Sequence, residues 1–345
     1  MQGIVVTFSL DLMAIPCLFP AKGDDAALTL TAKLNDLPIA VRLTSEQSPA
    51  RAKADGSDRR FYFNKVSISI TKNNENLANS DFIEGRARFL LMEFQHTVVE
   101  VLNRLIRFFK YEKRHPNLRP LYFSDFLSQE QQFCNPTWQT LDGQALTVSA
   151  TPLTSGIITI PGLGLLRDDL FGIQAFTADE APKLEQYLSS TNHIISLSEQ
   201  LLSDAQSAAL ANNVRRAVLE LAIAIEVFVK SAFFNQEKAV ESVFEYLMDK
   251  VRETVKVTEL LDSASLKVFG ESFKTASRES YRHLDHVFRC RNQVAHKGEP
   301  RYRDDSGAWH EADQELLLKW WEAAIEMFAW LQNRIEAAKE NRGRH

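Results

Sequence analysis

A run of polar and basic residues late in the chain, 289–298, holds the side chains best suited to chemistry. Asn292 and His296 are four residues apart, so on a helix they share one face, with the long side chain of Arg291 beside them. Histidine can gain or lose a proton near neutral pH, and a guanidinium supplies the permanent positive charge that a phosphate requires. The three residues together predict proton transfer at a phosphate group.

The run should lie at the end of a helix that begins near Ser277. Gly298 suits the residue that follows a helix, and Pro300 cannot continue one, so His296 is expected in the last turn. The negative end of the helix dipole favours an imidazolium there. Apolar residues at roughly helical spacing predict the buried stripe of this helix: Leu284, Val287, Phe288, Cys290 and Val294.

A second helix, 212–234, is apolar around most of its circumference and should be the central core helix. Glu226 lies within it, and a buried carboxylate needs a partner or must take up a proton. Arg291 is a candidate partner, in either a structural or a catalytic pair. Lys297 and Arg289, which flank the motif, are predicted to contact the phosphates of a nucleic acid.

At Arg291-Asn292-Gln293-Val294-Ala295-His296 the chain resembles the HEPN family (higher eukaryotes and prokaryotes nucleotide-binding). The resemblance covers residues 183–340 and implies a metal-independent endoribonuclease without a cofactor. In such enzymes the 2′-OH of RNA attacks the adjacent phosphorus and leaves a cyclic 2′,3′-phosphate. Two motifs usually meet across a homodimer, and similar domains often carry an acidic residue where Glu226 lies. Such nucleases act in microbes as toxins or antiviral defence effectors, which implies a regulatory protein partner.

Other interpretations remain open from the sequence alone. Arg291 could pair with an acid while His296 caps helix carbonyls, in a module that binds RNA, nucleotide or protein without cutting, or in a scaffold. His283 and His286 have a spacing compatible with a metal, but no further ligands are evident. Cys290 should face the core rather than act as a nucleophile, because it and His296 point to different faces.

Length and composition predict two domains. The 345 residues include 45% hydrophobic residues and carry a net charge of −5, which argues against indiscriminate binding of polyanions. Three widely separated cysteines fit a reducing cytoplasm, and no run approaches a membrane span. We expect an α+β domain of unknown role over residues 1–178, a sensor or an RNA-selecting domain, and an all-α HEPN-like bundle over residues 179–345.

The first domain should be an antiparallel sheet with one long helix. Alternating residues predict strands at 4–8, 27–34, 39–43 and 61–70, and shorter ones at 145–150 and 156–160. A helix from Asp81 to about Arg114 has basic late turns, read either as a solvated face or as an RNA-binding surface formed by Arg104, Arg107, Lys110 and Arg114. Helices of the second domain are expected at 183–210, 212–234, 237–254, 257–268, 276–297 and 311–340.

Overall fold

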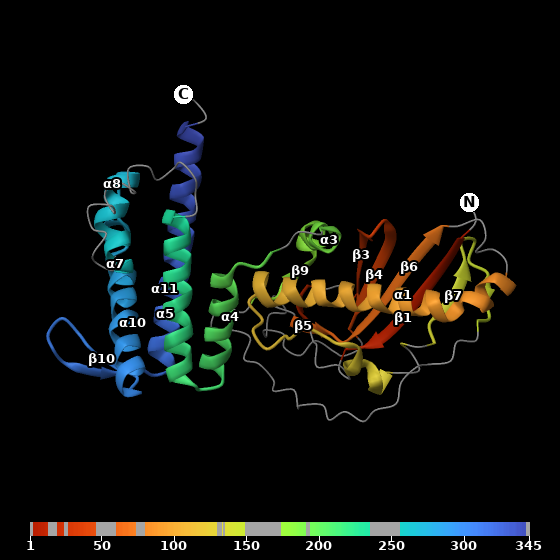
Figure 1. The fold of residues 1–345 in the computed structure, drawn as a ribbon, viewed down its shortest axis with the longest axis horizontal. Coiled ribbons are helices and arrows are strands. Elements are labelled where there is room, and N and C mark those ends of the chain that lie inside the picture. The colour runs from red at the N-terminus through yellow and green to blue at the C-terminus, as the bar shows by residue number, and fades with distance from the viewer. Residues whose placement is uncertain are drawn as a thin grey trace. The chain divides into compact units, whose positions relative to one another are not determined.

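The computed structural model describes residues 3–12, 19–23, 27–45, 60–73, 80–129, 133, 135–148, 174–190, 194–234 and 256–342. The chain forms two compact units, Met1–Ile194 and Ile195–His345. Figure 1 shows the sheet of the first unit and the helices of the second. Within the described ranges, no helix is both long enough and apolar enough to cross a bilayer. The strand predicted at 156–160 and the helix predicted at 237–254 lie outside them.

A six-stranded antiparallel sheet forms the centre of the first unit, in the order β3-β4-β6-β1-β7-β8. Its strands are β1 (Gly3–Asp11), β3 (Ala27–Leu34), β4 (Leu37–Thr44), β6 (Lys65–Asn73), β7 (Thr137–Thr140) and β8 (Ala145–Leu146). Alternate side chains point into the core, as Ile4, Val6 and Phe8 of β1 do, which is the pattern of a sheet covered on one face. The antiparallel sheet that the sequence predicts is confirmed.

The predicted strand at 61–70 is instead two strands that belong to different sheets. β5 (Arg60–Phe63) pairs with β2 (Phe19–Lys22), and β6 pairs with β1 and β4. Asn64 separates them: its carbonyl accepts from Leu12 N at 2.8 Å and its N–H donates to Thr44 O at 3.0 Å. β9 (Phe176–Thr177) joins β2 in parallel and completes a three-stranded sheet.

The long helix of the first unit, α1 (Ser80–Arg107), lies across the large sheet (Figure 1). An apolar stripe along this helix and into the turn that follows is buried in the same core as the strands: Leu91, Phe94, Val98, Leu102, Leu105 and Phe109. The α-helix ends earlier than predicted, because a π-helical turn, η2 (Phe108–Glu112), follows it. A 3₁₀ segment, η3 (Phe123–Gln129), comes later in the chain.

The division between the units lies after Ile194 rather than at the expected 178/179. A short 3₁₀ turn, η5 (Ala178–Glu180), leads into α3 (Ala181–Ser189), which packs on edge strand β3. Thr31 N donates to Glu185 Oε1 at 2.6 Å, and Lys33 N donates to Ser189 Oγ at 3.2 Å. Side chains of α3 therefore satisfy backbone groups that an edge strand would otherwise expose.

The second unit is a helical region built around α5 (Val214–Phe234), which packs against α4, α10 and α11. Its central position confirms the prediction for this helix. The other helical segments of the unit are α4 (Leu197–Leu210), α7 (Val257–Glu259), η6 (Leu260–Ala264), α8 (Ser265–Phe269), α9 (Phe273–Ala276), α10 (Arg278–Lys297) and α11 (Gln314–Arg342). The helix expected at 183–210 is thus two helices, α3 and α4, one in each unit.

A β-hairpin between α10 and α11 was not predicted. It consists of β10 (Arg301–Arg303) and β11 (Trp309–Glu311), which pair antiparallel, and β10 packs against α10. The hairpin begins directly beyond the end of the helix that carries the Arg291–His296 motif (Figure 1).

Candidate functional site

The motif occupies the last two turns of α10, and the local sequence explains why the helix ends there. Gly298 adopts φ 70° and donates its N–H to Val294 O at 2.9 Å, a left-handed conformation that glycine adopts without a steric cost. Asn292 and His296 are exposed, while the apolar stripe of the helix faces inward. The prediction of a capped helix with the polar residues turned outward is confirmed.

Arg291 is held at the junction of α10 and α5. Its Nη2 lies 3.4 Å from Glu226 Oε2, and its Nη1 donates to Asn292 Oδ1 at 3.3 Å. The other oxygen of Glu226 lies 2.5 Å from the Nζ of Lys230, one turn further along α5. Glu226 thus joins two cations, and the pairing expected between Glu226 and Arg291 is present. The side chains of Arg291 and Glu226 are 36% and 29% exposed, so water and ligands can reach the pair.

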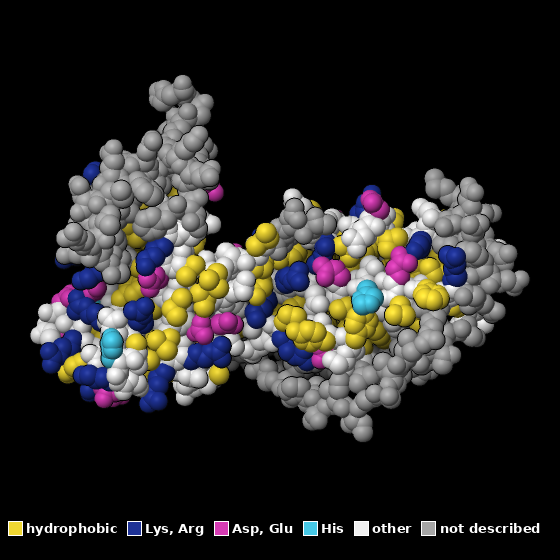
Figure 2. Space-filling model, viewed as in Figure 1, with side chains coloured by type: hydrophobic (Ala, Val, Ile, Leu, Met, Phe, Trp, Pro, Cys, Tyr) yellow, Lys and Arg dark blue, Asp and Glu magenta, His cyan; other side chains and the backbone are white. Residues whose placement is uncertain are grey.

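His296 has a different environment from Arg291. Its imidazole is exposed and, within the described part of the chain, has no hydrogen-bond or ion-pair partner. The neighbouring ammonium of Lys297 is exposed as well. Figure 2 shows basic side chains gathered at this end of the helical unit, with acidic ones among them. His296 and Lys297 are therefore accessible from solvent.

A groove of about 650 Å³ lies on the side of α5 that carries Glu226 and Lys230, which form the ion pairs described above. Glu226 and Lys230 contribute to its wall, together with Ile223 of α5 and the first residues of α4, Leu197 and Ser198. Apolar groups and one ion pair thus line an open space within the second unit. Through Glu226 the groove adjoins the guanidinium of Arg291.

Arg289, predicted to bind RNA, has a structural role. Its guanidinium lies 2.6 Å from Asp285 Oδ2 and 2.7 Å from Asp305 Oδ1, and it donates to the carbonyl of Arg303 at 3.0 Å. Burial lowers the pKa of Arg289, but the two carboxylates outweigh that effect and raise it above its ordinary value. Arg289 therefore anchors the hairpin to α10.

The basic residues of the first unit do not form the single exposed surface expected of them. Arg104 is buried and donates to the carbonyls of Leu188 at 2.6 Å and Ser190 at 2.8 Å. It therefore joins α1 to the end of α3, and its guanidinium is buried and already hydrogen-bonded, so it is not available to a phosphate. Arg107, Lys110 and Arg114 are half-buried. Burial lowers the pKa of Arg114. Arg104 and Arg107 belong to the α-helix itself, and the π-helical turn shifts only the later residues, Lys110 and Arg114, from their predicted α-helical positions.

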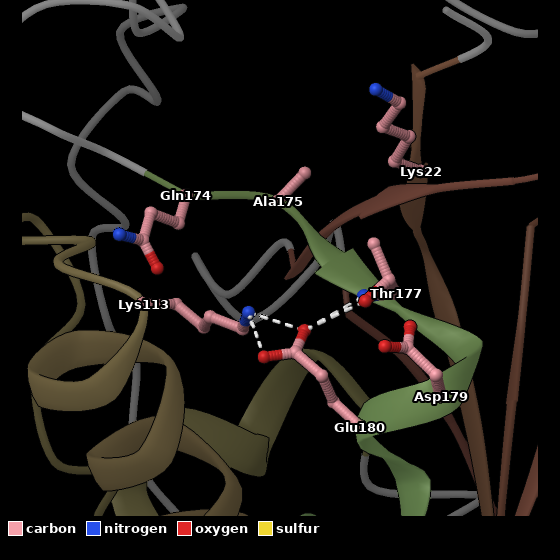
Figure 3. Close-up of a pocket in the computed structure, with 7 residues that line it drawn as sticks. All are labelled: Lys22, Lys113, Gln174, Ala175, Thr177, Asp179 and Glu180. Carbon is pink, nitrogen blue, oxygen red and sulfur yellow. Dashed lines mark hydrogen bonds and ion pairs between the residues drawn. The ribbon is translucent and has the colours of Figure 1, made fainter.

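A pocket of about 410 Å³ in the first unit contains a second ion pair (Figure 3). Lys113 is buried and donates to Glu180, which also accepts from Thr177 N at 2.9 Å. Burial raises the pKa of Glu180, but hydrogen bonds from Lys113 and Thr177 outweigh it and hold the pKa below its ordinary value. Lys22 and Asp179 complete the charged wall, with the ammonium of Lys22 apart from the pair in Figure 3. The buried lysine is thus already neutralised.

The remaining candidates on α10 pack within the unit. His286 is buried against Tyr302 with ring centroids 4.5 Å apart, and the centroid of His283 lies 6.5 Å from that of His286. Among the described residues, no group of three or more His, Cys, Asp or Glu is placed to hold a metal ion. Cys290 is fully buried, and desolvation raises the pKa of its thiol to about 12. The expectation that Cys290 packs in the core is confirmed.

Comparison of the chain with protein-family models, with curated proteins and with solved structures gives no match.

Sequence reasoning missed two parts of the site. Lys230 is absent from the predicted site, although its spacing of four residues from Glu226 indicates an ion pair on one helix face. The sequence suggests no role for Arg303, and it predicts that Trp309 packs the bundle or a dimer face, whereas Trp309 is 41% exposed. An Asp-Asp-Ser-Gly turn between short runs that alternate in polarity was the available signal, and Gly307 adopts φ 87° in that turn.

Proposed function

We propose that the second unit is an endoribonuclease of the HEPN type, which cleaves RNA without a metal ion. The observation that carries this proposal is the arrangement at the end of α10. An exposed His296 lies one turn beyond an exposed Asn292, and the adjacent Arg291 is held at the surface by Glu226. A proton carrier and a fixed cation are thus placed within two turns of one helix.

The chemistry assigned to these residues requires only groups that the chain and the substrate provide. A histidine removes the proton from the 2′-OH, whose oxygen attacks phosphorus, and the 5′ oxygen leaves with a proton. Arg291 neutralises the negative charge that accumulates on the non-bridging oxygens. Asn292 orients the phosphate or the ribose, and Lys297 adds a further positive charge. The products are a 2′,3′-cyclic phosphate and a 5′-OH.

A homodimer would supply two such histidines. A single imidazole starts the reaction as either base or acid, so one His296 from each of two copies could fill both roles at one phosphate. The exposure of the last turn of α10 supports this arrangement, because a second copy could approach it. A toxin or antiviral defence role, with a regulatory partner, would follow from such an activity.

Glu226 is a positioning residue in this scheme. It lies against Arg291 and Lys230 and has no place in the proton transfers. Its carboxylate lies against the guanidinium at the junction of α5 and α10, and a guanidinium oriented in advance loses less entropy when a phosphate binds.

A second candidate function is a module of the same shape that binds RNA, nucleotide or protein without cutting. The observation that favours it is that Glu226 already neutralises Arg291, which weakens the attraction of the site for a phosphate. The two candidates differ in their products, because only the enzyme generates cyclic phosphate ends.

The test is to incubate the full-length protein with single-stranded RNA in the presence of EDTA and to sequence the cut ends. We expect 2′,3′-cyclic phosphate ends from the wild type, and a loss of roughly 10²–10⁴-fold in rate for His296→Ala and for Arg291→Ala. RNA that carries 2′-O-methyl groups should resist cleavage. Arg215→Ala is a matched control, since Arg215 is an exposed arginine on α5. Undiminished cleavage by both motif variants would refute the enzyme, and saturable binding without any cleavage would favour the second candidate.

A further inference from the structure

We propose that the outer face of the β10–β11 hairpin is a stacking platform for an unpaired base of single-stranded RNA, formed by the ring of Trp309 and the guanidinium of Arg303. This inference rests on the proposed ribonuclease function and deepens it, because it names the form of RNA that the site receives. It is carried by the register of the hairpin, the exposure of the indole ring and the rigidity of the turn.

The pairing of the two strands places the residues of this platform on one face. Arg303 lies opposite Trp309 and Arg301 lies opposite Glu311, while Tyr302 and His310 form the pair between them. Because side chains alternate along a strand, the first two pairs share one face and the third points the other way. Tyr302 is buried and Trp309 is 41% exposed, so the face that carries Trp309 is the outer one.

Trp309 is an exposed tryptophan flanked by two arginines. The guanidinium carbons of Arg301 and Arg303 lie 4.6 Å and 4.9 Å from the centroid of its ring. By contrast, Trp320 and Trp321 of the same unit are 0% and 3% exposed and serve the core. The two guanidinium groups lie over the indole ring and cover part of it, and the part that remains exposed is an aromatic surface of the kind on which nucleic acid bases stack.

The hairpin is held rigid from within its turn. The carboxylate of Asp304 accepts hydrogen bonds from Ser306 N and Ala308 N, both at 2.9 Å, and from Ser306 Oγ at 2.7 Å, and its other oxygen lies 2.8 Å from His310 Nε2. These contacts, first of all that with the Ser306 hydroxyl, hold the pKa of Asp304 below its ordinary value. A platform ordered before binding loses little entropy when a ligand arrives.

The inner face of the hairpin fixes it to the helices. Tyr302 stacks between His286 and His310, with centroid distances of 4.5 Å and 5.4 Å, and its edge contacts Trp320 at 5.6 Å. The bonds from Arg289 to Asp305 and to the carbonyl of Arg303 add a second attachment, to α10. The platform therefore keeps a fixed place beside the helix that carries His296.

The charges on this face fit a base and its phosphate better than a run of phosphates alone. Arg301 pairs with Glu299 at 2.6 Å and also faces Glu311 across the strands. Arg303 forms no ion pair with any residue of the described chain. One uncompensated guanidinium beside one exposed indole matches a single nucleotide, whose base stacks while its phosphate pairs. A duplex, with its bases already stacked on each other, offers no such face.

The test measures binding by the full-length protein to a fluorescently labelled, single-stranded 2′-O-methyl RNA that cannot be cleaved. We expect Trp309→Ala to weaken binding by roughly five- to 150-fold, the range of one stacked base. Trp309→Phe should retain most of the affinity, because it keeps an aromatic face. Arg303→Ala should weaken binding while the matched control Arg215→Ala does not. An oligonucleotide with abasic sites and the corresponding duplex should both bind less tightly than the intact single strand.

Two results would overturn the inference: equal affinity of Trp309→Ala and wild type, or equal affinity for the abasic and the intact strand. Thermal melting of each variant checks that the fold is retained. We expect retention in the Trp309 variants, because this side chain is exposed. The two proposals can fail separately. Binding that depends on Trp309 in a protein that leaves cleavable RNA intact would retain the platform and refute the enzyme. RNA cleavage by the wild type, together with unchanged RNA affinity in Trp309→Ala, would support the enzyme and refute the platform.

Discussion

Each unit of the protein contains a basic residue paired with a glutamate, and the two pairs differ in what surrounds them. In the first unit the Lys113 and Glu180 side chains are 6% and 26% exposed, and the carboxylate also accepts from Thr177. In the second unit Arg291 and Glu226 are 36% and 29% exposed and lie 3.4 Å apart. The Lys113–Glu180 pair is closed, in the sense that it is largely buried and its carboxylate accepts further hydrogen bonds. The Arg291–Glu226 pair is open, in the sense that both side chains are partly exposed and their contact is longer.

This difference separates a structural ion pair from one available to a ligand. A buried lysine needs its carboxylate, because the energy lost on leaving water is recovered only through that contact. A half-exposed arginine contributes little to stability through its ion pair, and its exposed side remains open to a ligand while the glutamate orients it. Of these two pairs, the one on the helix that carries His296 is the more accessible to a ligand.

The largest effect on stability is expected from breaking the closed pair. Glu180→Gln leaves Lys113 charged and buried without a counter-ion, so the free energy of unfolding of the first unit should fall by about 3–5 kcal/mol. Chemical denaturation measures it, and Asp179→Asn, an exposed neighbour in the same pocket, is the matched control. A change in Glu180→Gln no greater than in that control would show that the pair is less closed than the structure indicates.

Removal of Arg104 should have the next largest effect. Arg104→Ala leaves the carbonyls of Leu188 and Ser190 without their donor, at a cost of about 2–3 kcal/mol in the free energy of unfolding. Arg107→Ala, on the same helix but half-buried, is the control and should change it much less. Neither substitution should change the affinity of the folded protein for RNA. A specific loss of RNA binding in a folded Arg104→Ala protein would restore the role in RNA binding first expected of it.

A smaller effect on stability is expected at the open pair. Glu226→Gln should change the free energy of unfolding by less than about 1 kcal/mol, yet lower the rate of RNA cleavage, because Arg291 loses the group that orients it. Glu220→Gln, which removes an acid that pairs with Arg216 on the same helix at 3.4 Å, should leave cleavage unchanged. Equal rates of RNA cleavage in Glu226→Gln and Glu220→Gln would show that Glu226 does not position Arg291 for the reaction.

The smallest effect concerns pH. Burial lowers the pKa of both His283 and His286, so the folded second unit holds them neutral while the unfolded chain takes up protons near pH 6.5. Their contribution to stability is present above about pH 6.5 and is lost progressively as the pH falls below it. Denaturation followed by tryptophan fluorescence at several pH values measures this slope. His286→Phe should make the slope shallower, and an unchanged slope would contradict the assignment.

The parts of the site that the sequence predicts correctly depend on local periodicity. The helix that carries His296, its end at Gly298 and the central position of α5 follow from residues within a few turns of each other. The pair formed by Glu226 and Arg291 follows from the rule that a carboxylate in an apolar helix requires a partner.

The parts that the sequence does not reveal depend on distant contacts. Arg104 looks like a surface arginine until the end of α3, 84 residues later in the chain, is placed against it. α3 itself has the pattern of a bundle helix, and its bonds to the edge of β3, together with the contact from Arg104, assign it to the first unit. Strands of three residues, such as β10 and β11, are too short for alternation to be distinguished from chance.

The junction at Asn64 has a consequence for how the first unit opens. One uninterrupted stretch of backbone supplies a strand to the six-stranded sheet and a strand to the three-stranded one, with a single residue between them. If β5 separates from the three-stranded sheet, or β6 from the six-stranded sheet, the covalent link through Asn64 therefore strains the other sheet as well. Amide protons of β5 and β6 should therefore exchange with deuterium at similar rates, as members of one cooperative unit.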